Sequence, residues 1–311
     1  MEKFEVVMIG NTAVGKTSML SALSNELDEY NLSGKVSLEP TTHEFKVLQE
    51  QWKEMVEQVE SQKPFTTLTT GIDGALVDFV EHKFDFKVDG SKEATVLFTD
   101  TRGGMTGDLD EKLIARVNNA FGVFCVIDAS VLIECHPSTN ERYNCPKFVK
   151  RLLSDVYNDG DGKQPRFVAF VLTKCEEYMA TTKGQKKLSD AFHKGYDTIV
   201  DMLKRVGTPP NIYLLAIQTM TCVRFLKLND KTKCPEFRVL PGKELKTKDC
   251  AYPLVILLKE LIDAINQVRR SGFLGKIVDK ILVLLRIRKS LKAYLDEVDA
   301  NIEMPDFYEE L

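Results

Sequence analysis

Short apolar runs alternate with amphipathic segments along most of this chain. Each run is rich in β-branched and aromatic residues, as expected for strands that are buried on both faces of a parallel sheet. The runs are Phe4–Ile9, Thr95–Asp100, Ala120–Asp128, Arg166–Thr173 and Asn211–Ile217. Helical patterns include Phe148–Tyr157, Leu188–Val206 and Pro253–Val268. This alternation predicts an α/β fold with a doubly wound, mostly parallel sheet.

Three other segments carry patterns of their own. Lys83–Val88 alternates apolar and charged residues, which predicts a strand with one solvated face. Within 28–63, apolar residues recur at helical spacing until Pro64 ends the pattern. The apolar face of this predicted helix consists of Phe45, Leu48, Trp52, Met55, Val56 and Val59. Within 219–251, the stretch Glu236–Glu244 is typical of a short hairpin. We interpret 28–63 and 219–251 as insertions into a domain that spans 1–270.

The C-terminal segment 271–311 is predicted to be an amphipathic helical extension with an acidic tail. Apolar residues of 273–285 share one helical face, and basic residues extend the positive charge to Lys292. From Asp296 onward there are seven acidic residues and no lysine or arginine. One interpretation is a peripheral contact of 273–292 with an anionic membrane, or with a groove on a partner. The other is a terminal helix that packs on the domain.

Composition narrows the class of protein. The chain has 311 residues and a net charge of −4, which gives no sign of a nucleic-acid-binding surface. Its seven cysteines lack paired spacing, and Cys135, His136 and Cys145 lack the second half of a metal site. No apolar run reaches the ~18 residues that a membrane-spanning helix needs. We therefore expect a protein of the reducing cytoplasm.

The first apolar run leads into a loop that is suited to polyphosphate. Gly10–Thr17 reads G-N-T-A-V-G-K-T, which fits the pattern G-x-x-x-x-G-K-[ST] at every fixed position. The glycines let backbone N–H groups turn inward, and the positive end of the following helix adds to their attraction for an anion. Lys16 can reach the β- and γ-phosphates, and Thr17 offers a hydroxyl to Mg²⁺. The predicted nucleotide-binding residues here are Gly10, Asn11, Thr12, Ala13, Val14, Gly15, Lys16, Thr17 and Ser18.

Polar signals also follow the later strands, where ligands of doubly wound sheets bind. Asp100 ends one strand and can hold magnesium through water, and Gly103 can offer its N–H to a γ-phosphate. Thr173–Glu176 reads T-K-C-E. The Glu176 carboxylate can accept N1–H and N2–H of guanine, and the stem of Lys174 can lie along the base. A backbone N–H at Ala216 or Ile217 could meet guanine O6.

Together these motifs resemble the Ras-like, or TRAFAC-class, GTPases over 1–270. The resemblance implies a G-domain-like P-loop fold, bound GTP or GDP, and Mg²⁺. Thr69–Asp73 is similar to the T-x-G-I-D switch I of Rab and Roc domains, which makes Thr69 the magnesium threonine. The residues alone leave the choice open among Thr66, Thr67, Thr69 and Thr70. The insertions resemble those of the larger bacterial GTPases of conflict and signalling systems.

Three departures from the family pattern affect the predicted activity. Gly104 stands where Ras-like proteins carry the glutamine that orients water, Arg102 stands in place of alanine, and Glu176 replaces aspartate. The resemblance implies a GTP-binding switch with slow or assisted hydrolysis and a protein effector or activator. Arg102 could act in its own site or across a homodimer interface. The alternatives are a nucleotide-locked scaffold without turnover and a P-loop ATPase or kinase. The predicted catalytic residues are Lys16, Thr69, Arg102 and Gly103, and the predicted metal ligands are Thr17, Thr69 and Asp100.

Overall fold

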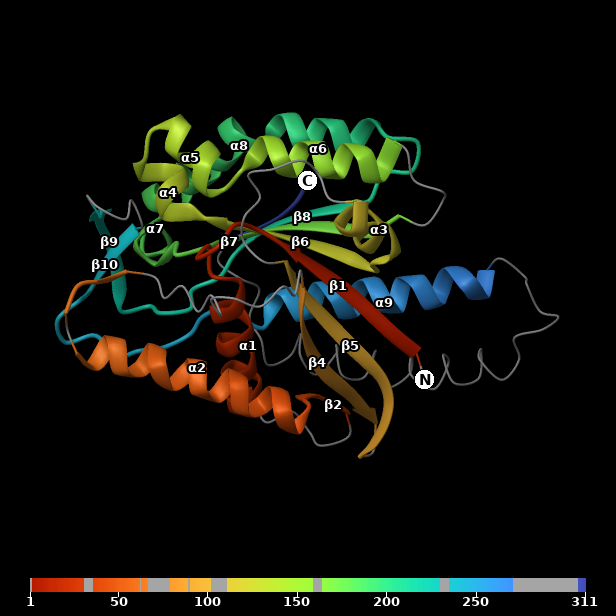
Figure 1. Cartoon of the computed structure of the whole chain (residues 1–311), viewed down its shortest axis with the longest axis horizontal. Coiled ribbons are helices and arrows are strands. Elements are labelled where there is room, and N and C mark those ends of the chain that lie inside the picture. The colour runs from red at the N-terminus through yellow and green to blue at the C-terminus, as the bar shows by residue number, and fades with distance from the viewer. Residues whose placement is uncertain are drawn as a thin grey trace.

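One large sheet forms the centre of the molecule (Figure 1). The computed structural model describes residues 2–30, 36–61, 63–66, 79–88, 90–101, 111–158, 164–229, 235–270 and 307–311. Within these ranges the sheet contains eight strands, which lie side by side in the order β11 (Tyr308–Glu310), β8 (Asn211–Ala216), β7 (Phe167–Thr173), β6 (Gly122–Asp128), β1 (Glu2–Ile9), β5 (Ser91–Thr101), β4 (Phe79–Val88) and β2 (Val36–Pro40). The strands from β8 to β5 run parallel, whereas β11, β4 and β2 pair antiparallel with their neighbours.

Helices cover both faces of this sheet (Figure 1). On one face lie α1 (Lys16–Tyr30) and α9 (Tyr252–Arg270), and α2 (Thr42–Glu60) packs beside α1. On the other face lie α3 (Glu111–Asn119), α6 (Pro146–Asn158) and α8 (Thr182–Arg205). The short helices α4 (Ala129–Glu134), α5 (Pro137–Tyr143) and α7 (Glu176–Met179) follow the ends of β6 and β7.

The prediction of a mixed α/β fold with a mostly parallel central sheet is confirmed. Every residue of β6 and β7 is buried, which explains why these strands read as unbroken apolar runs. β1 lies between β5 and β6, so the loop that follows β1 lies beside the ends of both neighbours. This strand order and the two helical layers are consistent with a G-domain-like fold.

The edges of the sheet differ from the sequence-based expectation. β4 is longer than the predicted strand at Lys83–Val88 and runs antiparallel to β5. Two short edge strands, β2 and β11, were not predicted. The helix predicted within 28–63 is present as α2, with Leu48, Met55 and Val59 buried. Phe45 is 42% exposed and does not belong to the buried face of that helix.

A second sheet combines two strands of the 219–251 segment with one short strand from outside that segment. Within the described residues it has the order β3 (Phe65–Thr66), β10 (Pro235–Val239) and β9 (Val223–Leu228), and all pairings are antiparallel. The predicted hairpin within Glu236–Glu244 is wrong. β10 pairs instead with β9, which precedes it. A turn closes at Leu240–Lys243, but in the described part of the chain no strand follows directly after that turn to complete the predicted hairpin.

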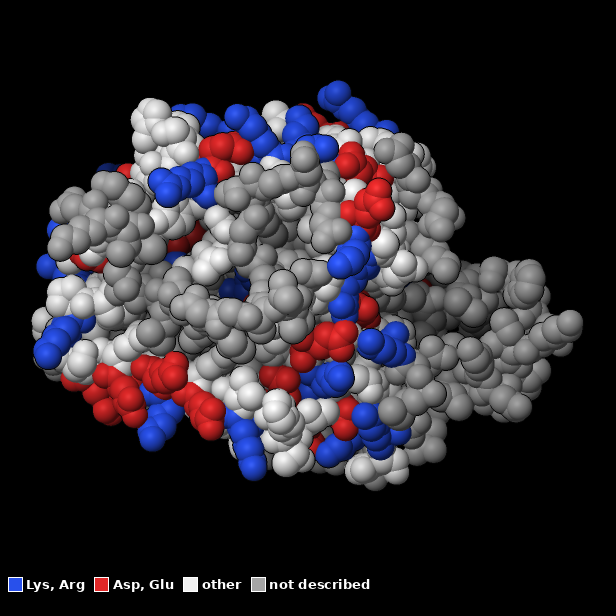
Figure 2. All heavy atoms as spheres, in the orientation of Figure 1, with Lys and Arg blue, Asp and Glu red and all other residues white. Residues whose placement is uncertain are grey.

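Charged side chains of both signs are interspersed over the face shown in Figure 2. Acidic side chains gather on the exposed side of α2, at Glu50, Glu54, Glu57 and Glu60. Among the described helices, none is both long enough and apolar enough to cross a membrane. The predicted amphipathic helix at 273–285, and with it the membrane contact proposed for 273–292, lies outside the described residues.

Candidate functional site

The loop between β1 and α1 has an unusual backbone conformation. Ala13 and Gly15 have φ angles of +66° and +106°, in the left-handed region that favours glycine. A Cβ atom at Gly10 would lie 2.8 Å from the Val126 carbonyl oxygen, and one at Gly15 would lie 3.3 Å from Thr173 Oγ1. Glycine is therefore required at Gly10 by close packing and favoured at Gly15 by the backbone angle. The chain turns sharply here, and α1 begins at Lys16.

Lys16 is buried inside this loop and is 6% exposed. Its ammonium donates to the carbonyl oxygens of Gly10, at 2.6 Å, and Asn11, at 3.0 Å. Burial lowers the pKa of Lys16, and the nearby Asp100 carboxylate opposes that change. A buried ammonium held mainly by carbonyl groups would gain from an anion, because its charge is only partly compensated.

Thr17 and Asp100 place hard oxygen atoms next to Lys16. Thr17 Oγ1 donates to Asp100 Oδ2 at 3.3 Å. Asp100 Oδ1 is 3.4 Å from Lys16 Nζ, yet it is buried and accepts no hydrogen bond from any described residue. Asp100 reaches this position because β5 pairs in parallel with β1, with Met8 opposite Asp100. A hydroxyl and a carboxylate with an unused lone pair suit Mg²⁺, which prefers oxygen ligands.

A second group of residues joins the end of β7 to this loop. Thr173 Oγ1 lies 2.5 Å from the Val14 carbonyl oxygen and can donate to it. Lys174 Nζ donates to the Ala13 carbonyl oxygen at 2.5 Å and to Asp128 Oδ2, also at 2.5 Å. The T-K-C-E segment therefore contacts the first loop directly, although Ala13 and Lys174 are 161 positions apart in the sequence.

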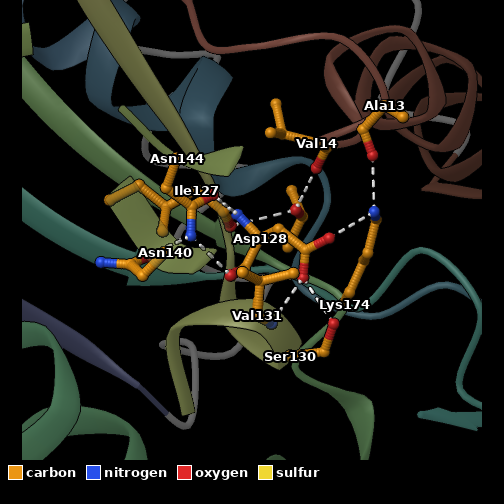
Figure 3. A network of polar contacts seen from close by, with 10 residues as sticks. Ala13, Val14, Ile127, Asp128, Ser130, Val131, Asn140, Asn144 and Lys174 are labelled. Atoms are coloured by element: carbon orange, nitrogen blue, oxygen red, sulfur yellow. Dashed lines mark hydrogen bonds and ion pairs between the residues drawn. The ribbon is translucent and has the colours of Figure 1, made fainter. Parts of the chain in front are cut away.

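Asp128 is the centre of the polar network shown in Figure 3. It is fully buried at the end of β6, where its Oδ1 accepts from Ser130 Oγ at 2.5 Å and from the Val131 N–H at 3.1 Å. Its backbone N–H donates to Asn144 Oδ1 at 2.9 Å. These contacts fix the carboxylate that receives Lys174. Sequence reasoning missed Asp128, although an acid at the carboxyl end of a buried strand was the available signal.

Glu176 lies at the first position of α7 and is 7% exposed. Its Oε1 accepts from the Met220 N–H at 3.2 Å. Burial raises the pKa of Glu176 to about 7, while backbone N–H groups of Glu176, Met220 and Thr219, and then the Lys174 charge, oppose the rise. This carboxylate is short of compensating donors in the protein alone, which is the condition in which a ligand N–H is most favourable.

The predicted base contacts at Ala216 and Ile217 stay a prediction, and both backbone N–H groups already have acceptors within the protein. The Ala216 N–H donates to the Phe307 carbonyl oxygen at 3.4 Å, and the Ile217 N–H donates to the Leu172 carbonyl oxygen at 2.9 Å. Both donors are used by the sheet, because β8 is flanked by β7 and by β11. The segment that faces Glu176 is the following one, through Met220.

Comparisons with known proteins add little to this geometry. The sequence matches no protein-family model and no curated protein. Among solved structures, it is similar to the bacterial selenocysteine-specific elongation factor EF-Sec, with 15% identity and a TM-score of 0.33 over 70% of this chain. The chain spans about a quarter of the length of that protein, since the match covers 26% of it.

The remaining predicted residues divide into two groups. Asn11 lies at the loop, where its Nδ2 donates to the Arg142 carbonyl oxygen at 3.1 Å, while Thr12 is exposed and Ser18 is half-buried in α1. Outside the described residues lie Thr67, Thr69, Thr70, Arg102, Gly103 and Gly104. Within the described part of the chain, no three His, Cys, Asp or Glu side chains gather as they would around a metal ion.

Proposed function

We propose that this chain binds a guanine nucleoside triphosphate together with Mg²⁺ and acts as a nucleotide-controlled switch. One observation carries the proposal. The buried ammonium of Lys16 and the buried carboxylate of Glu176 lie at the starts of α1 and α7, and the loops that precede these helices are joined through the contact between Lys174 and Ala13. Both charges lack full compensation within the protein. A guanine nucleotide would supply an anion at the first and two N–H donors at the second.

The polyphosphate would lie in the Gly10–Thr17 loop. Lys16 would exchange its carbonyl contacts for phosphate oxygens, and charge-assisted hydrogen bonds of this kind are stronger than those between neutral groups. The N-terminus of α1 adds backbone N–H donors and the positive end of the helix dipole. The close packing at Gly10 and the left-handed backbone at Gly15 keep this loop free of side chains that would fill the cradle.

Magnesium would be held by the Thr17 hydroxyl and, directly or through water, by Asp100. These residues fit the ion because Asp100 Oδ1 is buried and accepts no hydrogen bond from the described residues. When bound, the ion neutralises charge that develops on the phosphate oxygens. The protein's own part is to keep the two oxygen ligands 3.3 Å apart beside the Lys16 charge. Thr69, predicted to complete the metal site, stays a prediction.

The base would be selected by Glu176. Its carboxylate would accept N1–H and N2–H of guanine, which adenine does not present. Glutamate is one carbon longer than the aspartate of the family pattern, and here the carboxylate is held by the Met220 N–H. This contact supports a role for the longer side chain at the position where the resemblance expects aspartate.

Hydrolysis is proposed to be slow or assisted. Gly104 has no side chain that could orient water, and an arginine supplied at the right moment raises such rates by about 10³–10⁵. Arg102 remains the candidate, either in its own site or across a dimer, with a protein effector or activator as the other source of assistance. A nucleotide-locked scaffold is the alternative in the absence of turnover.

The deciding experiment is a binding competition between GTP and ATP in the presence of Mg²⁺. We expect GTP to displace a labelled GTP analogue at a far lower concentration than ATP does. Glu176→Ala should weaken GTP much more than ATP, because each unpaired guanine donor in a buried pocket costs about 1–3 kcal/mol. Glu177→Ala is the matched control, since Glu177 is the neighbouring acid in α7 and is exposed.

Equal affinity for the two nucleotides would reject guanine recognition and favour the P-loop ATPase or kinase alternative. Failure of both to bind wild-type protein would reject the proposed function altogether.

A further inference from the structure

Two residues with a left-handed backbone conformation are in contact at the centre of the proposed site. Lys174 has a φ angle of +54° and Ala13 has one of +66°, and the Lys174 ammonium donates to the Ala13 carbonyl oxygen. A non-glycine residue in this region is strained, and such strain persists only when surrounding contacts hold it. Other residues must therefore hold Lys174 and Ala13 in these strained conformations for their contact to persist.

An aromatic ring from the second sheet lies against this lysine. The Lys174 ammonium is 5.4 Å from the centre of the Phe237 ring. Phe237 belongs to β10 and is 3% exposed. A cation above the face of a ring is attracted by the ring's negative π-surface, and the attraction is larger where water is excluded. The side chain of Lys174 is itself only 8% exposed.

The backbone of β10 is irregular at this point. The pairing of β10 with β9 shifts register between Glu236 and Phe237, which marks a bulge or irregularity. Bulges redirect side chains and are common beside functional sites. Two further rings surround Phe237, namely Phe65 at 6.2 Å and Phe225 at 6.1 Å between centroids. These neighbours restrict the Phe237 ring to its position against Lys174.

The antiparallel pair of β9 and β10, the β9–β10 hairpin, is attached to the segment that holds Glu176. Met220 donates its N–H to Glu176 and accepts from the Val223 N–H at 3.1 Å, where β9 begins. At the other side of the hairpin, the Leu240 N–H donates to the Cys222 carbonyl oxygen at 2.7 Å. The hairpin thus connects to two residues of the T-K-C-E segment: to Lys174 through Phe237, and to Glu176 through Met220, which lies just ahead of β9.

We propose that Phe237 is a positioning residue for the purine nucleotide and that it acts through Lys174. The inference rests on the proposed function and deepens it. The ring stabilises the ammonium in the place where it bridges Ala13 and Asp128. With the ammonium held there, the lysine stem stays extended beside the base, and the first loop keeps its shape. If Phe237 has this role, the inserted β9–β10 hairpin is part of the nucleotide site.

The test compares GTP affinity in four proteins: wild type, Phe237→Leu, Lys174→Gln and the double variant. Leucine removes the π-face but keeps an apolar side chain, and glutamine removes the charge but can still donate to Asp128. We expect Phe237→Leu to weaken GTP binding by about tenfold, and Phe237→Tyr, which keeps the ring, to bind within about threefold of wild type. In the Lys174→Gln background, Phe237→Leu should add less than about twofold.

The matched control is Phe45→Leu, because it makes the same substitution at a ring that lies on α2 and is 42% exposed. It should change GTP affinity by less than about threefold. Urea unfolding of each variant shows whether it is folded, and Phe237→Met replaces Phe237→Leu if the latter is not.

Unchanged GTP affinity in a folded Phe237→Leu protein would overturn the inference. So would an equal loss with and without the Lys174 charge, since the ring would then act on the fold alone. A loss for Lys174→Gln combined with no loss for Phe237→Leu rejects the inference but leaves the proposed function standing. Wild-type protein that does not bind GTP rejects the function itself.

Discussion

The buried carboxyl group of Glu176 leads to a prediction about stability and pH. Its pKa in the folded protein is raised by burial from 4.5 to about 7. The unfolded chain therefore loses this proton near the lower value, while the folded chain keeps it until about pH 7. Between the two values the folded state holds the extra proton, so its stability falls as pH rises through this window and is highest below it.

The magnitude follows from the two pKa values. The difference between 4.5 and about 7 corresponds to about 3 kcal/mol, since one pKa unit is about 1.4 kcal/mol. Glu176→Gln removes the ionisation but keeps an oxygen that can accept the Met220 N–H. Without nucleotide, the variant should be more stable than wild type by about 3 kcal/mol at about pH 8, and by about 1 kcal/mol at about pH 5.

The assay is urea unfolding of nucleotide-free protein across this pH range. The difference between variant and wild type removes the contributions of all other titrating groups, and Glu177→Gln serves as an exposed control from the same helix. A stability difference that does not change with pH would show that burial does not raise the pKa of Glu176 in the folded protein. Protonation of Glu176 should also weaken GTP binding by wild type, because the N–H groups of guanine require an ionised carboxylate as acceptor. We therefore expect the affinity to fall by up to about tenfold per pH unit below about pH 7.

Three further predictions concern the phosphate end of the site. Lys16→Ala should weaken GTP binding by at least about tenfold, because a charged hydrogen-bond donor is lost. Equilibrium binding measures the loss, with Lys53→Ala, at an exposed lysine of α2, as the control. Equal GTP affinity of the two variants would contradict the assignment of the loop. Thr17→Asn and Asp100→Asn should lessen the gain in GTP affinity that Mg²⁺ gives wild type, and a gain as large as that of wild type would exclude them as ligands. Phosphate release should be slow in wild type. A rate per molecule that rises with protein concentration and falls in Arg102→Ala supports a dimer-assembled site. A rate that depends neither on concentration nor on this substitution excludes a catalytic role for Arg102.

Much of the proposed phosphate end could be predicted from the sequence because the interactions that shape it are local. The buried strand β1, the glycines of the loop and the start of α1 follow one another within a few residues, so spacing alone indicates the turn and the helix N-terminus. The unbroken apolar runs of β6 and β7 likewise follow from burial on both faces of a sheet, which leaves no solvated side to mark with polar residues. Because ligands of these sheets bind at the carboxyl ends of the strands, the ends of β5 and β7 indicated Asp100 and Glu176 as candidates.

The geometry of the proposed base end depends on pairings between distant parts of the chain. Ala216 and Ile217 follow a strand, as predicted, but their N–H groups are used by the sheet, in the case of Ala216 through the Phe307 carbonyl oxygen ahead of β11. That contact depends on the C-terminal residues returning to the edge of β8, which no local pattern indicates. The position of Asp128 against Lys174 depends in the same way on β6 and β7 lying side by side.

Phe237 shows the difference most clearly. Its apolar character and its place in a β-like stretch can be read from the sequence, yet they indicated a hairpin with the residues that follow it. The tertiary structure pairs β10 with β9 and β3, and shifts the register at Phe237. A shift of one residue moves a side chain to the other face of a strand. Local patterns therefore predict which residues form strands, while register and partner decide which of them reach the site.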